Sequence, residues 1–174
     1  DVYWTLGRSQ YLNEKLGKFL NLMRISIYQP DIPQNLAALL RLSACLNVPL
    51  DIIEPCGFPF SEKKFKRTVM DYSRYAELRT YIDFERYKRD VNEFYPKQRV
   101  ILLTTKSRNN YFDFRFKKND RILLGRESEG VPDEVRKWVD HDLKIMMPGQ
   151  GRSLNVVISC AMALSEALRQ TRHL

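Results

Sequence analysis

The stretch RISIYQPDIPQNLAALLRLSACLNVPLDII, residues 24–53, indicates the fold class of the chain. Residues 24–29 alternate apolar and polar side chains as a strand does, and residues 33–46 carry leucines at helical spacing. Proline-containing turn residues separate the two segments, and Asp31 is placed to cap the helix. A second run of strand length, residues 50–55, follows an Asn-Val-Pro turn. The stretch therefore predicts a β-α-β unit, whose two strands are parallel.

The rest of the chain repeats this order of strand and helix. Short apolar or aromatic runs predict further strands at residues 99–105, 111–114, 121–127 and 143–147. Helical segments are expected at residues 81–95, 132–139 and 154–170, the second of them opened by a proline. The segment 61–76 is polar and basic, with weak helical periodicity. Apolar strands separated by helices predict an α/β fold with a mostly parallel sheet and helices on both faces.

Length and composition are those of one ordinary globular domain. A chain of 174 residues with 44% apolar and 29% charged residues can form a single core. We expect residues 23–174 to form that domain and residues 1–22 to be an N-terminal extension, because the α/β pattern is complete without them. No run approaches the roughly 20 apolar residues of a membrane span. A cytoplasmic protein without membrane association is expected.

The cysteine and histidine content argues against a disulfide framework and a structural metal. Cys45, Cys56 and Cys160 are odd in number and far apart, and only two histidines accompany them. Neither the spacing nor the number of these residues matches a zinc site. We therefore expect no metal.

The net charge of +8 points to a polyanionic partner. Nucleic acid binds a basic surface by releasing its counterions, although a basic composition can also serve solubility alone. The cations cluster in the sequence KKFKR, residues 63–67, where four of them surround one aromatic residue. This cluster could form one face of the protein.

The sequence LLGRESEGVP, residues 123–132, imitates a phosphate-binding loop but changes its chemistry. Gly125 and Gly130 have the outer spacing of the G-x-G-x-x-G motif, whereas Glu127 replaces the middle glycine. A carboxylate there repels a pyrophosphate and suits a neutral or cationic ligand. Alternatively, the glycines only permit a tight turn and Glu127 caps the helix that follows.

A second polar loop, MPGQGRSLNVVISC at residues 147–160, leads into a strongly apolar helix. It resembles the nucleophile elbow of hydrolases, but Asn155 replaces the second glycine and no histidine is placed to activate Ser153. We reject the hydrolase interpretation. Gly149 and Gly151 instead let the backbone wrap a small molecule, with donors from the helix N-terminus and from Ser153, which we also expect to be the N-cap.

Three segments together resemble a known family. IPQNLAALLR (residues 32–41), LLGRESEGVP and IMMPGQGRSLNVVIS (residues 145–159) resemble the ordered motifs of the SpoU branch of the SPOUT RNA methyltransferases. The resemblance covers residues 24–171, and IIEPCGF and LTTK are most similar to the TrmL subfamily, the tRNA (cytidine/uridine-34) ribose 2′-O-methyltransferases. Ala37, Met146 and Ser165 depart from the glycine, proline and tyrosine found at these positions in family members.

The resemblance implies a C-terminal deep trefoil knot, a homodimer, and S-adenosylmethionine as the methyl donor for the wobble nucleotide of tRNA. Knots are exceptions to the usual topological rules. Carried over by position, the implied cofactor-site residues are Leu103, Gly125, Glu127, Ile145, Met147, Ser153 and Leu154. The implied catalytic residues are Arg41, Asn35 and Asn155.

Arg41 is expected to act through its charge rather than as a base. A guanidinium has a pKa above about 12 and is a poor proton acceptor at neutral pH. We expect Arg41 to hold a phosphate and stabilise developing alkoxide charge, while Asn35 and Asn155 orient the sugar and the loops.

The sequence leaves the RNA target open. The candidate RNA-binding residues are Lys63, Lys64, Lys66, Arg67 and Arg152. Phosphate contacts of this kind position an RNA without specifying its sequence. The same chemistry on another tRNA or ribosomal RNA ribose, and a non-catalytic RNA-binding member of the fold, are the alternatives.

Overall fold

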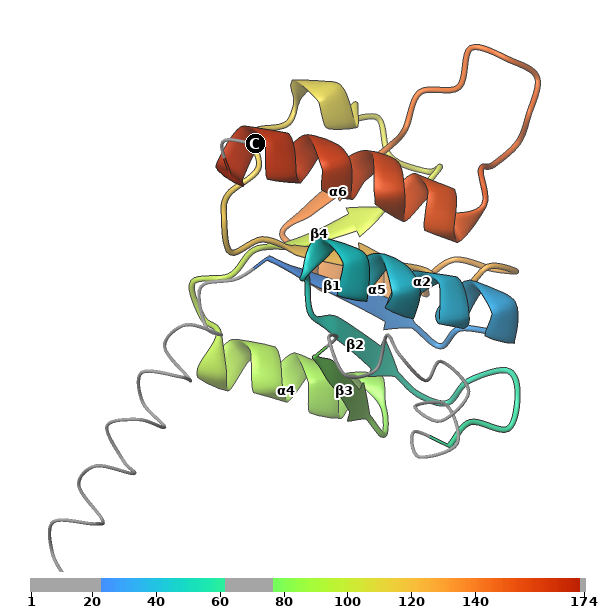
Figure 1. Cartoon of the computed structure of the whole chain (residues 1–174), viewed down its shortest axis with the longest axis vertical. Coiled ribbons are helices and arrows are strands. Elements are labelled where there is room, and N and C mark those ends of the chain that lie inside the picture. The colour runs from blue at the N-terminus through green and yellow to red at the C-terminus, as the bar shows by residue number, and fades with distance from the viewer. Residues whose placement is uncertain (1–22, 62–76, 173–174) are drawn as a thin grey trace, which may run out of the picture.

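The computed structural model describes residues 23–61 and 77–172, and these residues form a six-stranded parallel sheet between helices (Figure 1). The strand order is β3-β2-β1-β5-β4-β6, and every pairing in the sheet is parallel. The strands are β1 (Arg24–Tyr28), β2 (Leu50–Ile53), β3 (Leu78–Tyr81), β4 (Val100–Leu103), β5 (Arg121–Leu124) and β6 (His141–Leu143). The predicted α/β fold with a parallel sheet is confirmed.

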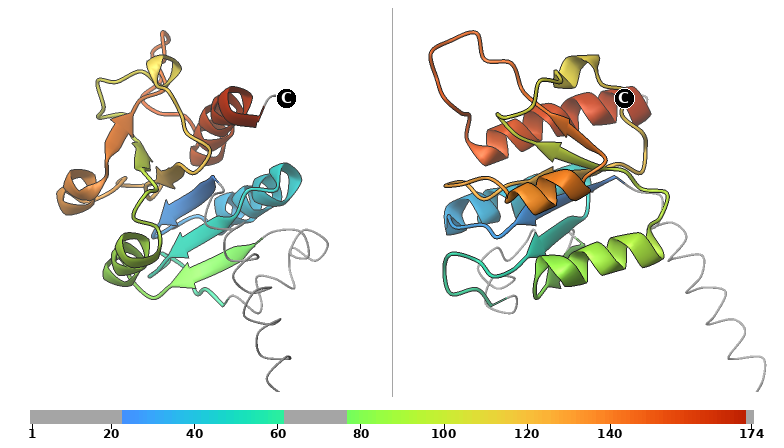
Figure 2. Two further views of the ribbon diagram at one scale, coloured as in Figure 1. Left: turned by 90° about the vertical axis from the view of Figure 1, so that its left-hand side faces the viewer. Right: turned by 180° about the vertical axis from the view of Figure 1, so that it is seen from behind.

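Helices cover both faces of the sheet, as predicted (Figure 2). Helices α2 (Pro33–Leu46) and α6 (Val156–Arg172) lie on one face, and α4 (Phe84–Phe94) and α5 (Asp133–Trp138) lie on the other. The predicted helix at residues 33–46 has the observed bounds. Strand side chains alternate between two cores: Ile25 and Ile27 belong to the cluster under α2 and α6, and Tyr28 belongs to the cluster under α4 and α5.

A buried ion cluster joins the amino ends of the central strands. Arg24 of β1 and Arg121 of β5 each place a guanidinium nitrogen 2.6 Å from a carboxylate oxygen of Asp51 on β2, and all three side chains are fully buried. Burial would by itself raise the pKa of Asp51, but the two guanidiniums hold that pKa below its ordinary value. Buried charges are tolerated only when they are paired in this way.

Two predicted elements require correction, and one strand was not predicted. Residues 111–114 are not a strand, because Tyr111–Asp113 form a 3-10 turn, η2, in which the Asn110 side chain accepts a hydrogen bond from the Phe112 amide. The last strand ends at Leu143, where we predicted that it begins, and the chain then leaves the sheet. Strand β3 was missed because it is a half-buried edge strand rather than an apolar run.

Helix starts also differ from the predictions. Helix α4 begins at Phe84, because the side chain of Asp83 accepts a hydrogen bond from the Arg86 amide and caps it there. Asp31 does not cap α2, whose N-cap is Ile32 without a side-chain cap bond. The Asp31 side chain is directed to another loop, described below.

In residues 23–61 and 77–172, no helix has the length and apolar character needed to cross a bilayer.

Cys45, Cys56 and Cys160 are free thiols. Burial raises the pKa of both Cys56 and Cys160 to about 12.

Replacing Asp51 should test the buried ion cluster. We expect Asp51→Asn to lower the free energy of unfolding by about 3–5 kcal/mol, because it removes the buried carboxylate that pairs with Arg121 and leaves Arg24 paired with Glu77 alone. The folded pKa of Asp51 is lowered, so its stabilising contribution is complete above the ordinary aspartate pKa of about 3.9 and disappears as pH falls through the folded value. Urea unfolding at pH 7 and at acidic pH measures both effects.

The matched control is Asp113→Asn, which changes an exposed aspartate of η2. This substitution should change the free energy of unfolding by less than about 0.5 kcal/mol. Equal losses in the two variants would contradict the role given to the ion cluster.

Candidate functional site

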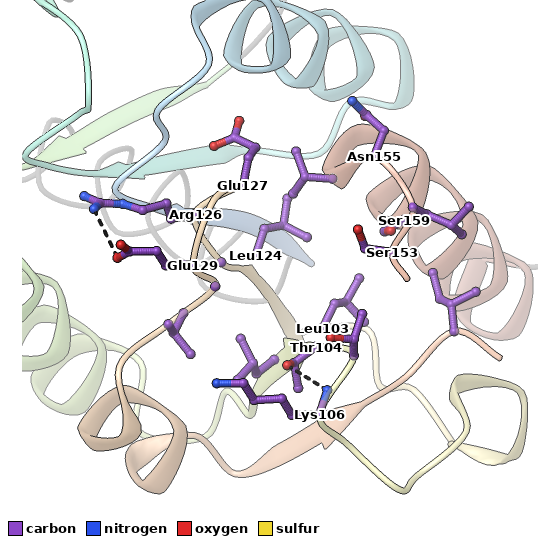
Figure 3. Close-up of a pocket in the computed structure, with 18 of the residues that line it drawn as sticks. Leu103, Thr104, Lys106, Leu124, Arg126, Glu127, Glu129, Ser153, Asn155 and Ser159 are labelled. Carbon is purple, nitrogen blue, oxygen red and sulfur yellow. Dashed lines mark hydrogen bonds and ion pairs between the residues drawn. The ribbon is translucent and has the colours of Figure 1, made fainter. Parts of the chain in front are cut away.

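A cavity of about 600 Å³ opens at the carboxyl ends of β4, β5 and β6 (Figure 3). Its walls come from five parts of the chain: the start of α2, residues 102–106, residues 124–131, Arg136 of α5 and residues 143–159. Ligands of open parallel sheets bind outside the carboxyl ends of the strands, and this volume is within the usual range for a small-molecule site. The sheet therefore brings the two polar loops of the sequence to one place.

The loop after β5 is a closed turn that depends on two glycines. The Arg126 amide donates to the Gly130 carbonyl, and the Gly130 amide donates to the Arg126 carbonyl, both at 2.9 Å. Gly130 has a φ of +76°, and a Cβ on Gly125 would lie 2.8 Å from the Gly130 backbone. The interpretation of these glycines as a tight turn is confirmed, but Glu127 does not cap α5, whose N-cap Pro132 has no side-chain cap bond.

The Glu127 carboxylate instead binds the loop between β1 and α2. Its Oε2 accepts from the Asp31 amide at 3.0 Å, and its Oε1 accepts from Asn35 Nδ2 at 3.1 Å. Burial and the neighbouring Asp31 carboxyl raise the pKa of Glu127, while hydrogen bonding with Glu127 lowers the pKa of Asp31. Within this pair, a proton therefore resides more readily on Glu127.

Asn35 also contacts the N-terminus of α6. Asn155 Nδ2 donates to Asn35 Oδ1 at 3.0 Å, and Asn155 Oδ1 accepts from the Val157 and Ile158 amides at 2.8 and 3.4 Å. Asn155 is thus the N-cap of α6, and the prediction that Ser153 fills this position was wrong. One chain of hydrogen bonds, Glu127–Asn35–Asn155, connects the three motif segments.

Most of the predicted site residues lie around this cavity. It is lined by Asn35, Leu103, Gly125, Glu127, Ile145, Met147, Arg152, Ser153, Leu154 and Asn155. Arg41 is different: its side chain is exposed on α2 and does not line the cavity. Lys63, Lys64, Lys66 and Arg67 lie outside the described residues, so their RNA-binding role stays a prediction.

Sequence reasoning missed residues that support the cavity wall. Arg136 of α5 donates to Asp142 Oδ2 at 3.0 and 2.8 Å and to the Lys106 carbonyl at 3.1 Å, which joins the loop after β4 to β6. Asp31 holds the turn after β5, 96 residues away in the sequence. Neither role has a local signal, because each partner is distant along the chain.

Comparisons with known proteins agree with this geometry. Residues 22–165 match the profile described as the SpoU rRNA Methylase family. The chain is 44% identical over 146 residues to a tRNA (cytidine(34)-2′-O)-methyltransferase of Beijerinckia indica subsp. indica, covering 84% of this chain and 90% of that protein. A protein of the same description from Aeromonas hydrophila subsp. hydrophila is 34% identical, with 86% and 94% covered.

Solved structures share the fold. One, described as giving structural insights into the 2-OH methylation of C/U34 on tRNA, superposes with a TM-score of 0.78 at 35% identity and covers 87% of this chain and 97% of that one. The SpoU methyltransferase AviRb from Streptomyces viridochromogenes superposes with a TM-score of 0.75 at 19% identity, covering 86% of this chain and 60% of that one. The second likeness concerns the fold alone.

Two substitutions at Asn155 should separate its two hydrogen-bonding roles. Asn155→Ala removes the helix cap and should lower the free energy of unfolding by about 1 kcal/mol. Asn155→Asp keeps an acceptor for the α6 amides and adds favourable negative charge at the helix N-terminus, but it removes the donor to Asn35. Urea unfolding should therefore show that the aspartate variant retains most of the stability.

Ser165→Ala, at an exposed position of α6, serves as the control and should unfold like the unsubstituted protein. If alanine and aspartate at position 155 cost the same stability, Asn155 does not act as the cap of α6.

Proposed function

The chain belongs to the SpoU rRNA methylase family, and we propose that it transfers a methyl group to the ribose 2′-hydroxyl of nucleotide 34, cytidine or uridine, of tRNA. The observation that carries this proposal is the convergence of the three motif segments on one cavity. The tRNA cytidine-34 methyltransferases that the chain resembles are matched over 90% or more of their length, which supports the same target here.

We propose S-adenosylmethionine as the methyl donor, and the residues of the cavity fit it. Glu127 and Glu129 bring carboxylates to a wall that also carries Lys106, Arg126, Arg136 and Arg152, so groups of both charges are available to a donor that has a sulfonium cation and a carboxylate. When bound, this cofactor supplies an electrophilic methyl group. Leu103, Ile145, Met147 and Leu154 provide the apolar wall, while the turn at Gly125 and the Ser153 hydroxyl provide polar groups.

The remaining catalysis is assigned to positioning and charge. Asn35 is held from both sides, by Glu127 and by Asn155, so its amide is fixed at the edge of the cavity where the ribose would lie. Holding two reactants in line can lower a barrier by several kcal/mol. The 2′-hydroxyl must also lose its proton, and a phosphate of the RNA or a water molecule is the proposed acceptor.

Arg41 is assigned to the RNA rather than to the cofactor in this proposal, because it does not line the cavity. It lies six residues beyond Asn35 on α2, about 9 Å along the helix axis. Its exposed guanidinium would hold a phosphate and stabilise the developing negative charge on the ribose oxygen. This placement agrees with a role outside the methyl-donor site.

The homodimer implied by the family is proposed to form through α2 and α6. These helices lie beside one another on the same face of the sheet (Figure 1), and three apolar side chains on them or at their start are exposed: Ile32, Ile158 and Met162 at 41, 52 and 38%. Exposed apolar groups on neighbouring elements are typical of subunit contacts.

The family's trefoil knot is part of the same proposal. It is supported by the close association of α6 with the segment after β4, because Gln170 accepts from the Phe116 amide at 2.9 Å and donates to the Phe114 carbonyl at 3.1 Å.

A methylation assay tests the function directly. Purified protein with S-adenosylmethionine should introduce a 2′-O-methyl group at nucleotide 34 of tRNA, detected by ribose-methylation mapping.

Arg41→Ala should abolish this methylation. Calorimetry should show an unchanged affinity of this variant for S-adenosylmethionine, because Arg41 does not line the cavity. Comparable turnover in Arg41→Ala would reject its role. Binding of tRNA without methylation by the unsubstituted protein would favour a non-catalytic RNA-binding function, and methylation at another nucleotide would change the target.

Sedimentation velocity tests the proposed dimer. Ile158→Lys places a charge in the apolar face of α6 and should convert a dimer to monomer at micromolar concentration. Ile82→Lys is the control, since Ile82 is also exposed, at 76%, but precedes α4 on the other face of the sheet. Monomeric unsubstituted protein, or dissociation by both substitutions, would contradict this interface.

A further inference from the structure

Asp31 uses its backbone amide and both carboxylate oxygens on the turn that carries Glu127. Its Oδ1 accepts from the Glu127 amide at 3.2 Å, its Oδ2 accepts from the Ser128 hydroxyl, and its own amide donates to Glu127 Oε2 at 3.0 Å. Building on the proposed function, we propose that Asp31 is a positioning residue, which holds the Glu127 carboxylate in the orientation required for methyl transfer.

The contacts of Asp31 distinguish this role from that of a helix cap. An aspartate just before a helix ordinarily accepts from the first helical amides, but α2 begins at an N-cap, Ile32, that makes no side-chain bond. Both carboxylate oxygens of Asp31 bond instead to residues 96 and 97 positions away in the sequence. The side chain therefore joins two loops of the cavity rather than beginning a helix.

The other side of Asp31 is closed by Gly57. A Cβ on Gly57 would lie 2.6 Å from the Asp31 Cβ and 2.9 Å from its Cα, and the Gly57 amide donates to the Pro30 carbonyl at 2.9 Å. Asp31 is thus confined between the chain after β2 and the turn after β5. A side chain confined in this way has few alternative rotamers, as preorganisation of a site requires.

Gln29 and Arg126 form a second connection between the same two loops. Arg126 Nε donates to the Gln29 carbonyl at 3.2 Å, and its Nη2 donates to Gln29 Oε1 at 2.9 Å. Gln29 has a φ of +44°, an uncommon conformation for a residue other than glycine, and such conformations concentrate at functional sites. The turn is fixed by Arg126 on one side and by Asp31 on the other, so Glu127 between them has a defined direction toward Asn35.

A double-mutant cycle on the full chain tests the proposal. Asp31→Ala should reduce the single-turnover rate of tRNA methylation about ten- to a hundredfold, the range expected when a reacting group is misplaced. In a Glu127→Gln background, Asp31→Ala should cause less than about a twofold further loss, because the carboxylate that it positions is already gone. Asp31→Asn keeps Oδ1 as an acceptor for the Glu127 amide and should restore part of the rate.

Asp83→Ala is the matched control, because it also removes a loop aspartate that accepts a backbone hydrogen bond, at the start of α4. It should lower the melting temperature without changing the methylation rate. If Asp31→Ala lowers the methylation rate equally with and without the Glu127 substitution, Asp31 is only structural and the inference is overturned.

If the unsubstituted protein methylates no tRNA, the proposed function fails, and hydrogen exchange of the Glu127 amide then tests the role of Asp31 separately. Faster exchange at Glu127 in Asp31→Ala would support loop positioning, and unchanged exchange would overturn it.

Discussion

The site depends on the side-chain amide of Asn35. Its nitrogen donates to Glu127 in the turn after β5, and its oxygen accepts from Asn155 at the start of α6, at 3.1 and 3.0 Å. A side chain that could only donate or only accept would satisfy one of these partners and leave the other unpaired, which is unfavourable where water is partly excluded. Asn155 uses its oxygen to cap α6, so the position of Asn35 also affects the start of that helix.

The amino ends of the strands carry a buried ion cluster, at the opposite side of the sheet from the cavity. At the amino ends, Arg24, Asp51 and Arg121 form a fully buried cluster between β1, β2 and β5. Paired buried charges contribute little net stability, but an unpaired one is strongly unfavourable, so each strand must keep its register relative to the others. Because the strands are parallel, a register determined at their amino ends also determines where their carboxyl ends and the loops of the cavity lie.

The cavity combines a glycine turn with acidic side chains, which separates it from the usual nucleotide sites. A phosphate-binding turn presents free backbone amides at a helix N-terminus. Here the Arg126 and Gly130 amides are used within the turn, the Glu127 amide bonds to Asp31, and carboxylates lie beside them. Because Lys106, Arg126, Arg136 and Arg152 also line the cavity, it differs from a phosphate-binding turn by using these amides within the protein rather than by an acidic net charge.

The sequence by itself determined the α/β class, the helix at residues 33–46 and the tight turn at Gly125 and Gly130, because periodicity and turn chemistry depend on residues a few positions apart. Family resemblance supplied the residues that the fold places around the cavity. Only the tertiary structure decided that Asp31 bonds to Glu127 rather than capping α2, that Asn155 rather than Ser153 caps α6, and that the last strand ends at Leu143. Asp31 and Glu127 lie 96 residues apart, and Asn155, which caps α6 through nearby amides, also bonds to Asn35 at a separation of 120 residues, so these pairs meet only when the parallel strands bring their loops to one edge of the sheet.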